Sequence, residues 1–135
     1  MTYEVMIVDD SAMMRTVITN FVGKLPEFDV VAFAGNGKIA LEALAKHNNL
    51  SLILLDIEMP EMDGLEFLRY AKLKSKAKII ILSSVALAGS PQAAKARQLG
   101  ADAIVAKPSG SVSFDLVDKR GDELTKVMRQ LVGLG

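Results

Sequence analysis

The chain contains no cysteine among its 135 residues. This absence excludes disulfide bonds, zinc–thiolate sites and thiol nucleophiles, and it is typical of proteins in a reducing compartment. The sequence also has no apolar run near the roughly 18 residues that a membrane-spanning helix requires. Asp9 and Asp10 interrupt the start of the chain, where a secretory signal would be apolar. We therefore expect a cytoplasmic protein without membrane insertion.

The chain also lacks a net charge, because sixteen basic residues balance sixteen acidic ones. Attraction of the whole chain to nucleic acid or to an anionic membrane is therefore not expected, and specific binding must come from a local patch. The length of 135 residues suits one domain that buries about two thirds of its unfolded surface. We expect residues 1–135 to form a single domain, with no room for a second.

Five short segments rich in Val, Ile and Leu alternate with helical patterns. Continuous apolar runs of this length are typical of parallel strands buried on both faces, and we predict strands at residues 4–8, 29–34, 52–55, 78–82 and 102–106. Helices are predicted from caps at Ser11, Asn36, Asp63 and Ser90 to ends near Gly23, Lys46, Ala71 and Gly100, and a last helix carries Leu124, Val127, Met128 and Leu131. The alternation predicts an α/β domain of the flavodoxin-like (βα)5 type, a doubly wound five-stranded parallel sheet in the order 2-1-3-4-5.

One connection is longer than the others in this alternation of strands and helices. Residues 108–121, PSGSVSFDLVDKRG, form a Ser- and Gly-rich connection between the fifth strand and the last helix. Such a connection is longer than the few residues that usually join a strand to its helix. We expect this segment to be the least regular part of the domain.

Charged and hydroxyl side chains stand where the predicted strands end. Asp9 and Asp10 follow the first strand, Asp56 the third, Ser83 the fourth and Lys107 the fifth. The carboxyl ends of parallel strands meet at one edge of the sheet, so these residues are expected to converge there. Three carboxylates at one place repel each other, and a cation with oxygen ligands, such as Mg2+, relieves that repulsion. The sequence therefore predicts an acidic metal site.

A metal-bound carboxylate at this edge can accept a phosphoryl group. One oxygen of Asp56 would act as the nucleophile, and the product would be an aspartyl phosphate. The cation and the ammonium group of Lys107 would offset the charge on the phosphoryl oxygens. A serine hydroxyl at the end of the fourth strand would hydrogen-bond one of those oxygens.

The segments VMIVDDSAMMR, LILLDIEMPEMDG, IIILSS and GADAIVAKP resemble, in order and spacing, the signatures of the response-regulator receiver domain of two-component signalling. The resemblance spans residues 3–131. It implies that Asp56 is the phospho-acceptor, that Asp10 is a direct ligand of Mg2+, with Mn2+ as a substitute, and that Asp9 holds a metal-bound water. It further implies a metal ligand in the backbone carbonyl of Glu58, a switch hydroxyl on Ser83, a charge-neutralising Lys107 and a cis bond before Pro108. The implied phosphoryl donor is a sensor histidine kinase.

A narrower resemblance joins DIEMPEMDGLEFLR, ILSSVA and AKPSGSVSFDL to the receiver portion of the chemotaxis protein-glutamate methylesterases. It implies a role in chemotaxis and a linked output domain with methylesterase activity, whereas this chain would itself catalyse only its own phosphorylation and dephosphorylation. We expect no catalytic domain within these 135 residues, and we interpret the chain as an excised regulatory domain or a stand-alone relative. We expect a monomer, or a weak dimer that depends on phosphorylation, and no direct contact with nucleic acid.

The chain departs from the family pattern at Ile104. Many receivers carry Tyr or Phe three positions before the lysine, and that ring changes rotamer during switching. An aliphatic side chain cannot report switching in this way, so we hypothesise that the signal passes mainly through Ser83 and its adjoining loop.

Two other functions stay open. A phosphatase with an aspartyl nucleophile would need a second aspartate two residues after the nucleophile, where this chain has Glu58. A vestigial receiver would act as a constitutive protein-interaction module, although all five site positions are intact.

Overall fold

The computed structural model describes residues 2–56, 64–83, 91–106 and 114–134. Strands and helices alternate in the described residues: β1 (Tyr3–Val8), α1 (Ala12–Gly23), β2 (Phe28–Ala34), α2 (Gly37–Lys46), β3 (Leu50–Asp56), α3 (Gly64–Lys74), β4 (Lys78–Ser83), α4 (Pro91–Gln98), β5 (Ala103–Ala106) and α5 (Phe114–Leu131). Each predicted strand and helix is present. Within the described ranges, every helix is too short or too polar to cross a membrane.

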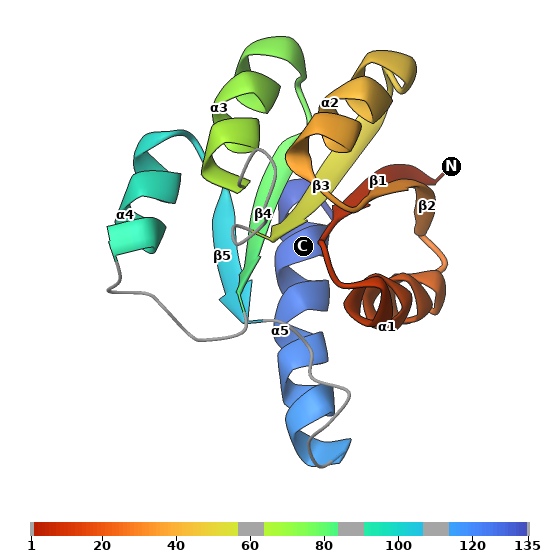
Figure 1. Cartoon of the computed structure of the whole chain (residues 1–135). Coiled ribbons are helices and arrows are strands. Elements are labelled where there is room, and N and C mark those ends of the chain that lie inside the picture. The colour runs from red at the N-terminus through yellow and green to blue at the C-terminus, as the bar shows by residue number, and fades with distance from the viewer. Residues whose placement is uncertain (1, 57–63, 84–90, 107–113, 135) are drawn as a thin grey trace.

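The five strands form one parallel sheet in the order β2-β1-β3-β4-β5 (Figure 1). This is the predicted flavodoxin-like order. The chain runs from β1 outward to β2 and then returns past β1 to β3, so the direction of winding reverses between β1 and β3. In such sheets a crevice forms at the reversal, outside the carboxyl ends of the two strands.

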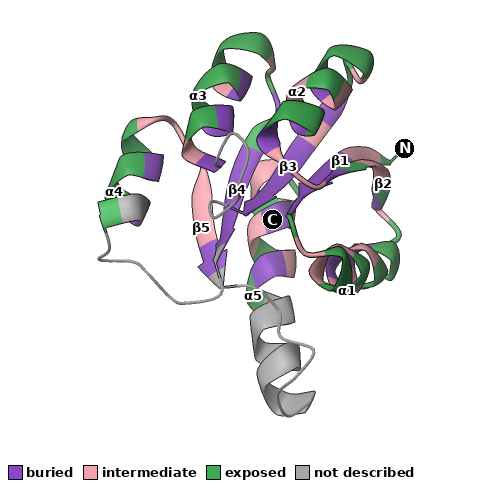
Figure 2. Cartoon of the chain, viewed as in Figure 1, coloured by how far each residue is buried: buried purple, intermediate pink, exposed green. Residues whose placement is uncertain are grey.

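Helices cover both faces of the sheet: α1 and α5 lie on one face, and α2, α3 and α4 lie on the other (Figure 1). Successive strand residues point to opposite faces, so each strand contributes to two cores. Ile53 of β3 packs in the same cluster as Phe67 of α3, whereas its neighbour Leu54 packs in the cluster of Met128 of α5. Figure 2 shows the resulting buried strands between half-exposed helices. Burial on both faces explains why the strand sequences are continuously apolar.

Two of the predicted helix caps are confirmed. The hydroxyl of Ser11 accepts a hydrogen bond from the backbone N–H of Met14 at 3.2 Å, and the side-chain oxygen of Asn36 accepts one from Ile39 at 2.8 Å. Each bond satisfies a backbone donor that the first helical turn leaves unpaired. The predicted caps Asp63 and Ser90 lie outside the described residues.

The last helix begins earlier than predicted. Helix α5 starts at Phe114, so residues 114–121 of the expected irregular connection are helical, and residues 108–113 lie outside the described residues. Gly121 argues against a helix by only about 1 kcal/mol relative to alanine. Phe114 and Val117 continue the apolar spacing of Leu124 and Met128 toward the N-terminus. The longer amphipathic pattern therefore outweighs the local glycine.

A half-buried carboxylate, that of Asp102, fixes the start of β4. One oxygen of Asp102 accepts hydrogen bonds from the ammonium of Lys72 at 3.1 Å and from the backbone N–H of Ile79 at 2.8 Å. The backbone N–H of Asp102 donates in turn to the carbonyl of Ile79 at 2.8 Å. Asp102 thus joins α3, β4 and the start of β5.

Replacing Asp102 by alanine is expected to lower the free energy of unfolding by about 1–3 kcal/mol, because the buried N–H of Ile79 loses its acceptor. Replacing Lys72 by methionine removes only a partly exposed ion pair, which contributes about 0–1 kcal/mol. Urea unfolding of the two variants and the wild type measures both effects. Equal losses in the two variants would show that the ion pair, and not the backbone bond, is what Asp102 contributes.

Candidate functional site

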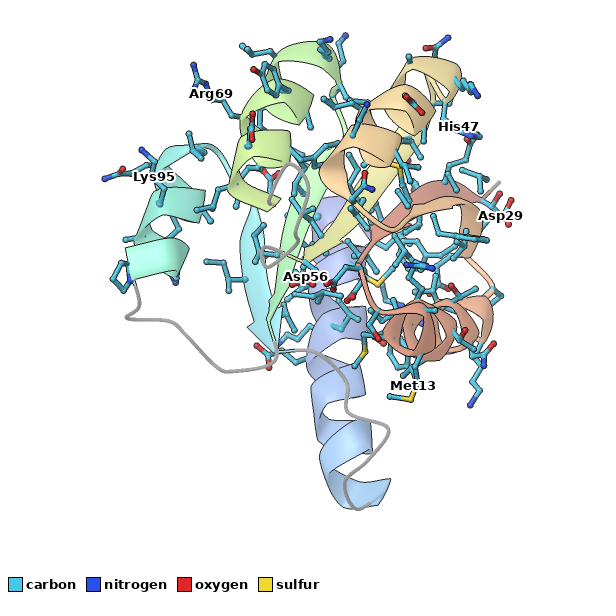
Figure 3. All side chains as sticks on the ribbon, in the orientation of Figure 1. Met13, Asp29, His47, Asp56, Arg69 and Lys95 are labelled. Carbon is cyan, nitrogen blue, oxygen red and sulfur yellow. The ribbon has the colours of Figure 1, made fainter. Side chains whose placement is uncertain are left out.

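Three carboxylates meet where β1 and β3 end. Asp9 and Asp10 directly follow β1, and Asp56 is the last residue of β3, which pairs with β1 up to Val8 and Leu55. One ligand oxygen from each carboxylate lies within 4.8 Å of the other two. Asp9 and Asp56 are 1% and 5% exposed, whereas Asp10 is exposed. Figure 3 shows Asp56 in the middle of this edge.

The donor set of this cluster fits a hard divalent cation. All three ligands are carboxylate oxygens, which Mg2+ and Mn2+ prefer over nitrogen or sulfur. Two of the carboxylates are buried, where their mutual repulsion is less screened by water than at the surface. A cation held by Asp9, Asp10 and Asp56 would offset this repulsion.

The β1–α1 turn holds Asp9 in place. The backbone N–H of Ser11 donates to Oδ1 of Asp9 at 2.9 Å. Nη1 of Arg15 donates to the backbone carbonyl of Asp9 at 2.7 Å. The same nitrogen lies 3.1 Å from the position that a Cβ atom would take at Gly35, so the guanidinium fills the space beside the end of β2. Arg15 therefore joins α1, the end of β1 and the end of β2.

Sequence reasoning missed Arg15. The available signal was its place four residues after the helix cap Ser11, one helical turn along α1, where a long cationic side chain can reach back to the preceding strand.

Replacing Arg15 by methionine is expected to weaken Mg2+ binding by about 10- to 100-fold, the usual cost of losing a residue that positions a metal ligand. Methionine keeps the apolar volume but gives no donor to the carbonyl of Asp9. Replacing the exposed Lys24 at the other end of α1 by methionine removes the same charge without touching the site. NMR titration with Mg2+ measures both affinities, and an unchanged affinity in the Arg15 variant would contradict this role.

The remaining predicted site residues are placed only in part. Ser83 is the last residue of β4, one position beyond the pairing of Asp56 with Leu82, so its backbone belongs to the same edge. Ile104 lies in β5, pairs with Ile81 and is a half-buried residue that packs against the α2–α4 core. The other expected participants, Glu58, Lys107 and Pro108, lie outside the described residues.

Comparison with known proteins gives a consistent family. Residues 5–116 match the family model described as the response regulator receiver domain. A protein-glutamate methylesterase/protein-glutamine glutaminase of Syntrophomonas wolfei is 39% identical over 126 residues, which are 93% of this chain and 35% of the relative. A protein of the same name from Geobacillus kaustophilus is 38% identical over 94% of this chain and 36% of its own length. The chain spans about a third of the length of these relatives.

Solved structures agree with this result. The response regulator domain of Thermotoga maritima CheB superposes with a TM-score of 0.85 at 32% identity, covering 100% of this chain and 99% of that one. A chain in the crystal structure of the P1 domain of CheA3 in complex with CheY6 from R. sphaeroides gives a TM-score of 0.82 at 62% identity, with 96% of both chains covered. The family match, the strand order and the acidic cluster between β1 and β3 lead to one conclusion: the chain belongs to the response regulator receiver domain family.

Proposed function

We propose that this chain is a phosphorylatable switch in a chemotaxis pathway, with Asp56 as the acceptor and Mg2+ held by Asp9, Asp10 and Asp56. The observation that carries the proposal is the meeting of these three carboxylates within 4.8 Å at the reversal of the sheet. The family match supports it. The backbone carbonyl of Glu58 is proposed as a further ligand.

In the proposed reaction, a carboxylate oxygen of Asp56 attacks the phosphorus of a phosphohistidine. The new P–O bond forms as the P–N bond breaks, and the freed imidazole nitrogen keeps the electron pair. A divalent cation held by Asp9, Asp10 and Asp56 would supply positive charge that offsets the charge of the phosphoryl group. Lys107 adds a second positive charge, and the hydroxyl of Ser83 donates a hydrogen bond to a phosphoryl oxygen. Burial of Asp56, at 5% exposed, limits access of water to the acyl phosphate.

The donor is proposed to be a sensor histidine kinase, and its P1-type domain the direct partner. The crystal structures of CheY6 with the P1 domain of CheA3, in one case phosphorylated, support this choice. The methylesterase names of the curated relatives support an output domain of that activity, linked to this chain or separate from it. A monomer or a weak phosphorylation-dependent dimer, and the cytoplasmic location, stay predictions.

We propose that the signal leaves the site through Ser83 and the loop after β4. Ile104 supports this route, because a half-buried aliphatic side chain on β5 has no ring to reorient. An Ile104→Tyr variant restores such a ring. The proposal predicts that this variant gains phosphorylation-dependent affinity for the output partner. An affinity that stays equal to that of the wild type, with and without phosphorylation, would leave it without support.

Intact-mass spectrometry after incubation with acetyl phosphate and Mg2+ tests the proposed function. The wild type is expected to gain one phosphoryl group, and Asp56→Asn is expected to gain none. Asp29→Asn, which changes an exposed aspartate on β2, is the matched control and should behave as the wild type. Absence of an adduct in the wild type, together with failure to bind beryllofluoride, would favour a constitutive interaction module.

A further inference from the structure

The neutral chain has a strongly uneven distribution of charge. Between Glu66 and Asp102 the sequence contains no acidic residue and seven basic ones: Arg69, Lys72, Lys74, Lys76, Lys78, Lys95 and Arg97. All of these except the half-buried Lys72 are exposed. A run of one sign on folded, exposed elements creates a local positive field that the zero net charge conceals.

Apart from Lys78, the first residue of β4, these cations lie on α3, the segment after it and α4, and the two helices are neighbours on one face of the sheet (Figure 1). Figure 3 shows Arg69 on α3 and Lys95 on α4, both directed away from the body of the domain. We call the surface made by Arg69, Tyr70, Leu73, Lys74, Lys76 and Lys95 the α3–α4 face. It lies on different elements from the β1–α1 turn and the acidic cluster.

The α3–α4 face has an apolar centre. Leu73 is 80% exposed and Tyr70 is 37% exposed. The two side chains are three residues apart on α3 and are therefore neighbours on its surface, with Arg69 four residues before Leu73 and Lys74 four residues after Tyr70. An exposed apolar and aromatic centre inside a charged rim is typical of protein-binding surfaces, where a dry centre supplies affinity and the charged rim selects the partner.

A polar cavity adjoins the end of this face. It has a volume of about 320 Å³ and opens where α2 and α3 end, between His47 and Asn48 on one side and Lys74, Ser75 and Lys76 on the other. Two lysines and several hydrogen-bond donors in one hollow suit a carboxylate better than an apolar group.

Helix stability explains only part of the pattern. Basic residues in the last turn interact favourably with the negative end of the helix dipole, which accounts for Lys72, Lys74, Lys95 and Arg97. It does not account for Arg69 in the middle of α3, for Lys76 beyond its end, or for an exposed leucine.

The composition of the face also selects among anionic partners. Segment 67–101 contains two aromatic residues, and Phe67 is buried, so Tyr70 alone cannot form the stacking platform of a single-strand nucleic-acid site. The apolar stripe of α3 that would enter a membrane is already buried in the core through Phe67, Leu68 and Ala71. With nucleic acid and membrane disfavoured, the partner that best fits the α3–α4 face is a protein segment with few apolar and many acidic side chains.

We propose that the α3–α4 face docks an acidic amphipathic helix of a protein partner. Apolar side chains of that helix would cover Leu73 and Tyr70. Its carboxylates would meet Arg69, Lys74, Lys76 and Lys95, with one carboxylate in the cavity beside Lys74 and Lys76.

A designed peptide tests the proposal without knowledge of the natural partner. The probe is a fluorescein-labelled helix of about five turns, with leucine on one stripe and glutamate elsewhere, and the control peptide has the same composition in an order without a stripe. Fluorescence anisotropy with the full chain gives the affinity, and amide NMR shifts locate the site. We expect the striped peptide to bind at least about tenfold more tightly than the control, with shifts over residues 69–76 and 95, and to weaken as salt rises.

Matched variants separate the apolar centre from the rim. Leu73→Asn and the pair Lys74→Glu with Lys76→Glu should each weaken binding about tenfold or more. Met13→Asn, at a similarly exposed apolar residue on α1, and Lys126→Glu on α5 should leave the affinity unchanged. Circular dichroism confirms that each variant is folded. Binding that is absent, that maps elsewhere or that survives these changes would overturn the proposal. So would tighter binding to phosphatidylserine vesicles or to a DNA duplex than to the peptide.

Discussion

Replacing Asp9 and Asp10 together by asparagine is expected to stabilise the metal-free domain and to remove its stabilisation by Mg2+. The reason is the position of these carboxylates, which lie within 4.8 Å of Asp56 and repel it. Asparagine removes two charges, while its oxygen at position 9 can still accept the bond that Oδ1 of Asp9 accepts from the N–H of Ser11. The fold of the turn should therefore survive the loss of the metal site.

Urea unfolding in EDTA and in Mg2+ measures both parts of this prediction. A ligand present at 100 times its dissociation constant stabilises the folded state by about 2.7 kcal/mol. The wild type should show a gain of this order, and the double variant should show none. A variant with two exposed acids replaced elsewhere, Asp29→Asn with Glu42→Gln, controls for net charge and should respond to Mg2+ as the wild type does. If the double variant retained the Mg2+ response, the cation would have to bind at another place.

Replacing Phe67 by alanine is expected to lower the free energy of unfolding by about 3–5 kcal/mol. Phe67 is the largest fully buried side chain in the described part of the chain, with 0% exposure. It packs between α3 and the sheet. Alanine leaves a cavity that the surrounding parallel strands cannot close, because they are held by pairing on both sides. The loss is a large fraction of the roughly 5–15 kcal/mol that stabilises a typical domain.

Phe33→Ala gives the matched comparison. This phenylalanine lies on the edge strand β2 and is 63% exposed, so its removal should change the stability by about 0.5 kcal/mol or less. Thermal and urea unfolding of the two variants should therefore differ widely although the chemical change is identical. Similar losses would mean that Phe33 is buried in solution, for example by contact between chains.

The sequence was informative where local pattern and topology agree. Buried parallel strands are continuously apolar on both faces, so the strands were evident, and crossover handedness left few strand orders. Because the carboxyl ends of parallel strands meet at one edge of a sheet, Asp9, Asp10 and Asp56 could be placed together although Asp56 lies far along the chain from the others. The caps Ser11 and Asn36 were predictable because they act on backbone donors only three residues away.

Features that depend on packing between distant elements were less predictable. The contact of Arg15 with the carbonyl of Asp9 depends on how α1 sits against β1 and β2. The early start of α5 at Phe114 reflects an amphipathic pattern that Gly121 obscures locally. From its residue type, Leu73 would be expected in the core, and only the fold shows that it lies on the outer side of α3.

The narrower likeness to methylesterase receivers is confirmed by the curated relatives and by the CheB domain structure. Helix α5 takes up residues 114–121, the second half of the Ser-rich stretch that suggested this likeness. A chain from the CheY6 complex is 62% identical to this one, so the likeness of this chain is not limited to the methylesterase receivers.

Titration of the chain with Mn2+, followed by the loss of amide NMR signals, tests most directly the claim that the ends of β1 and β3 form a divalent-cation site. Mn2+ takes the same oxygen ligands as Mg2+ and broadens the signals of nearby nuclei. We expect broadening first at Asp9, Asp10 and Asp56, reversed by excess Mg2+ and absent from the Asp9→Asn, Asp10→Asn variant. Broadening centred on other acidic residues, or none at these three, would contradict the account.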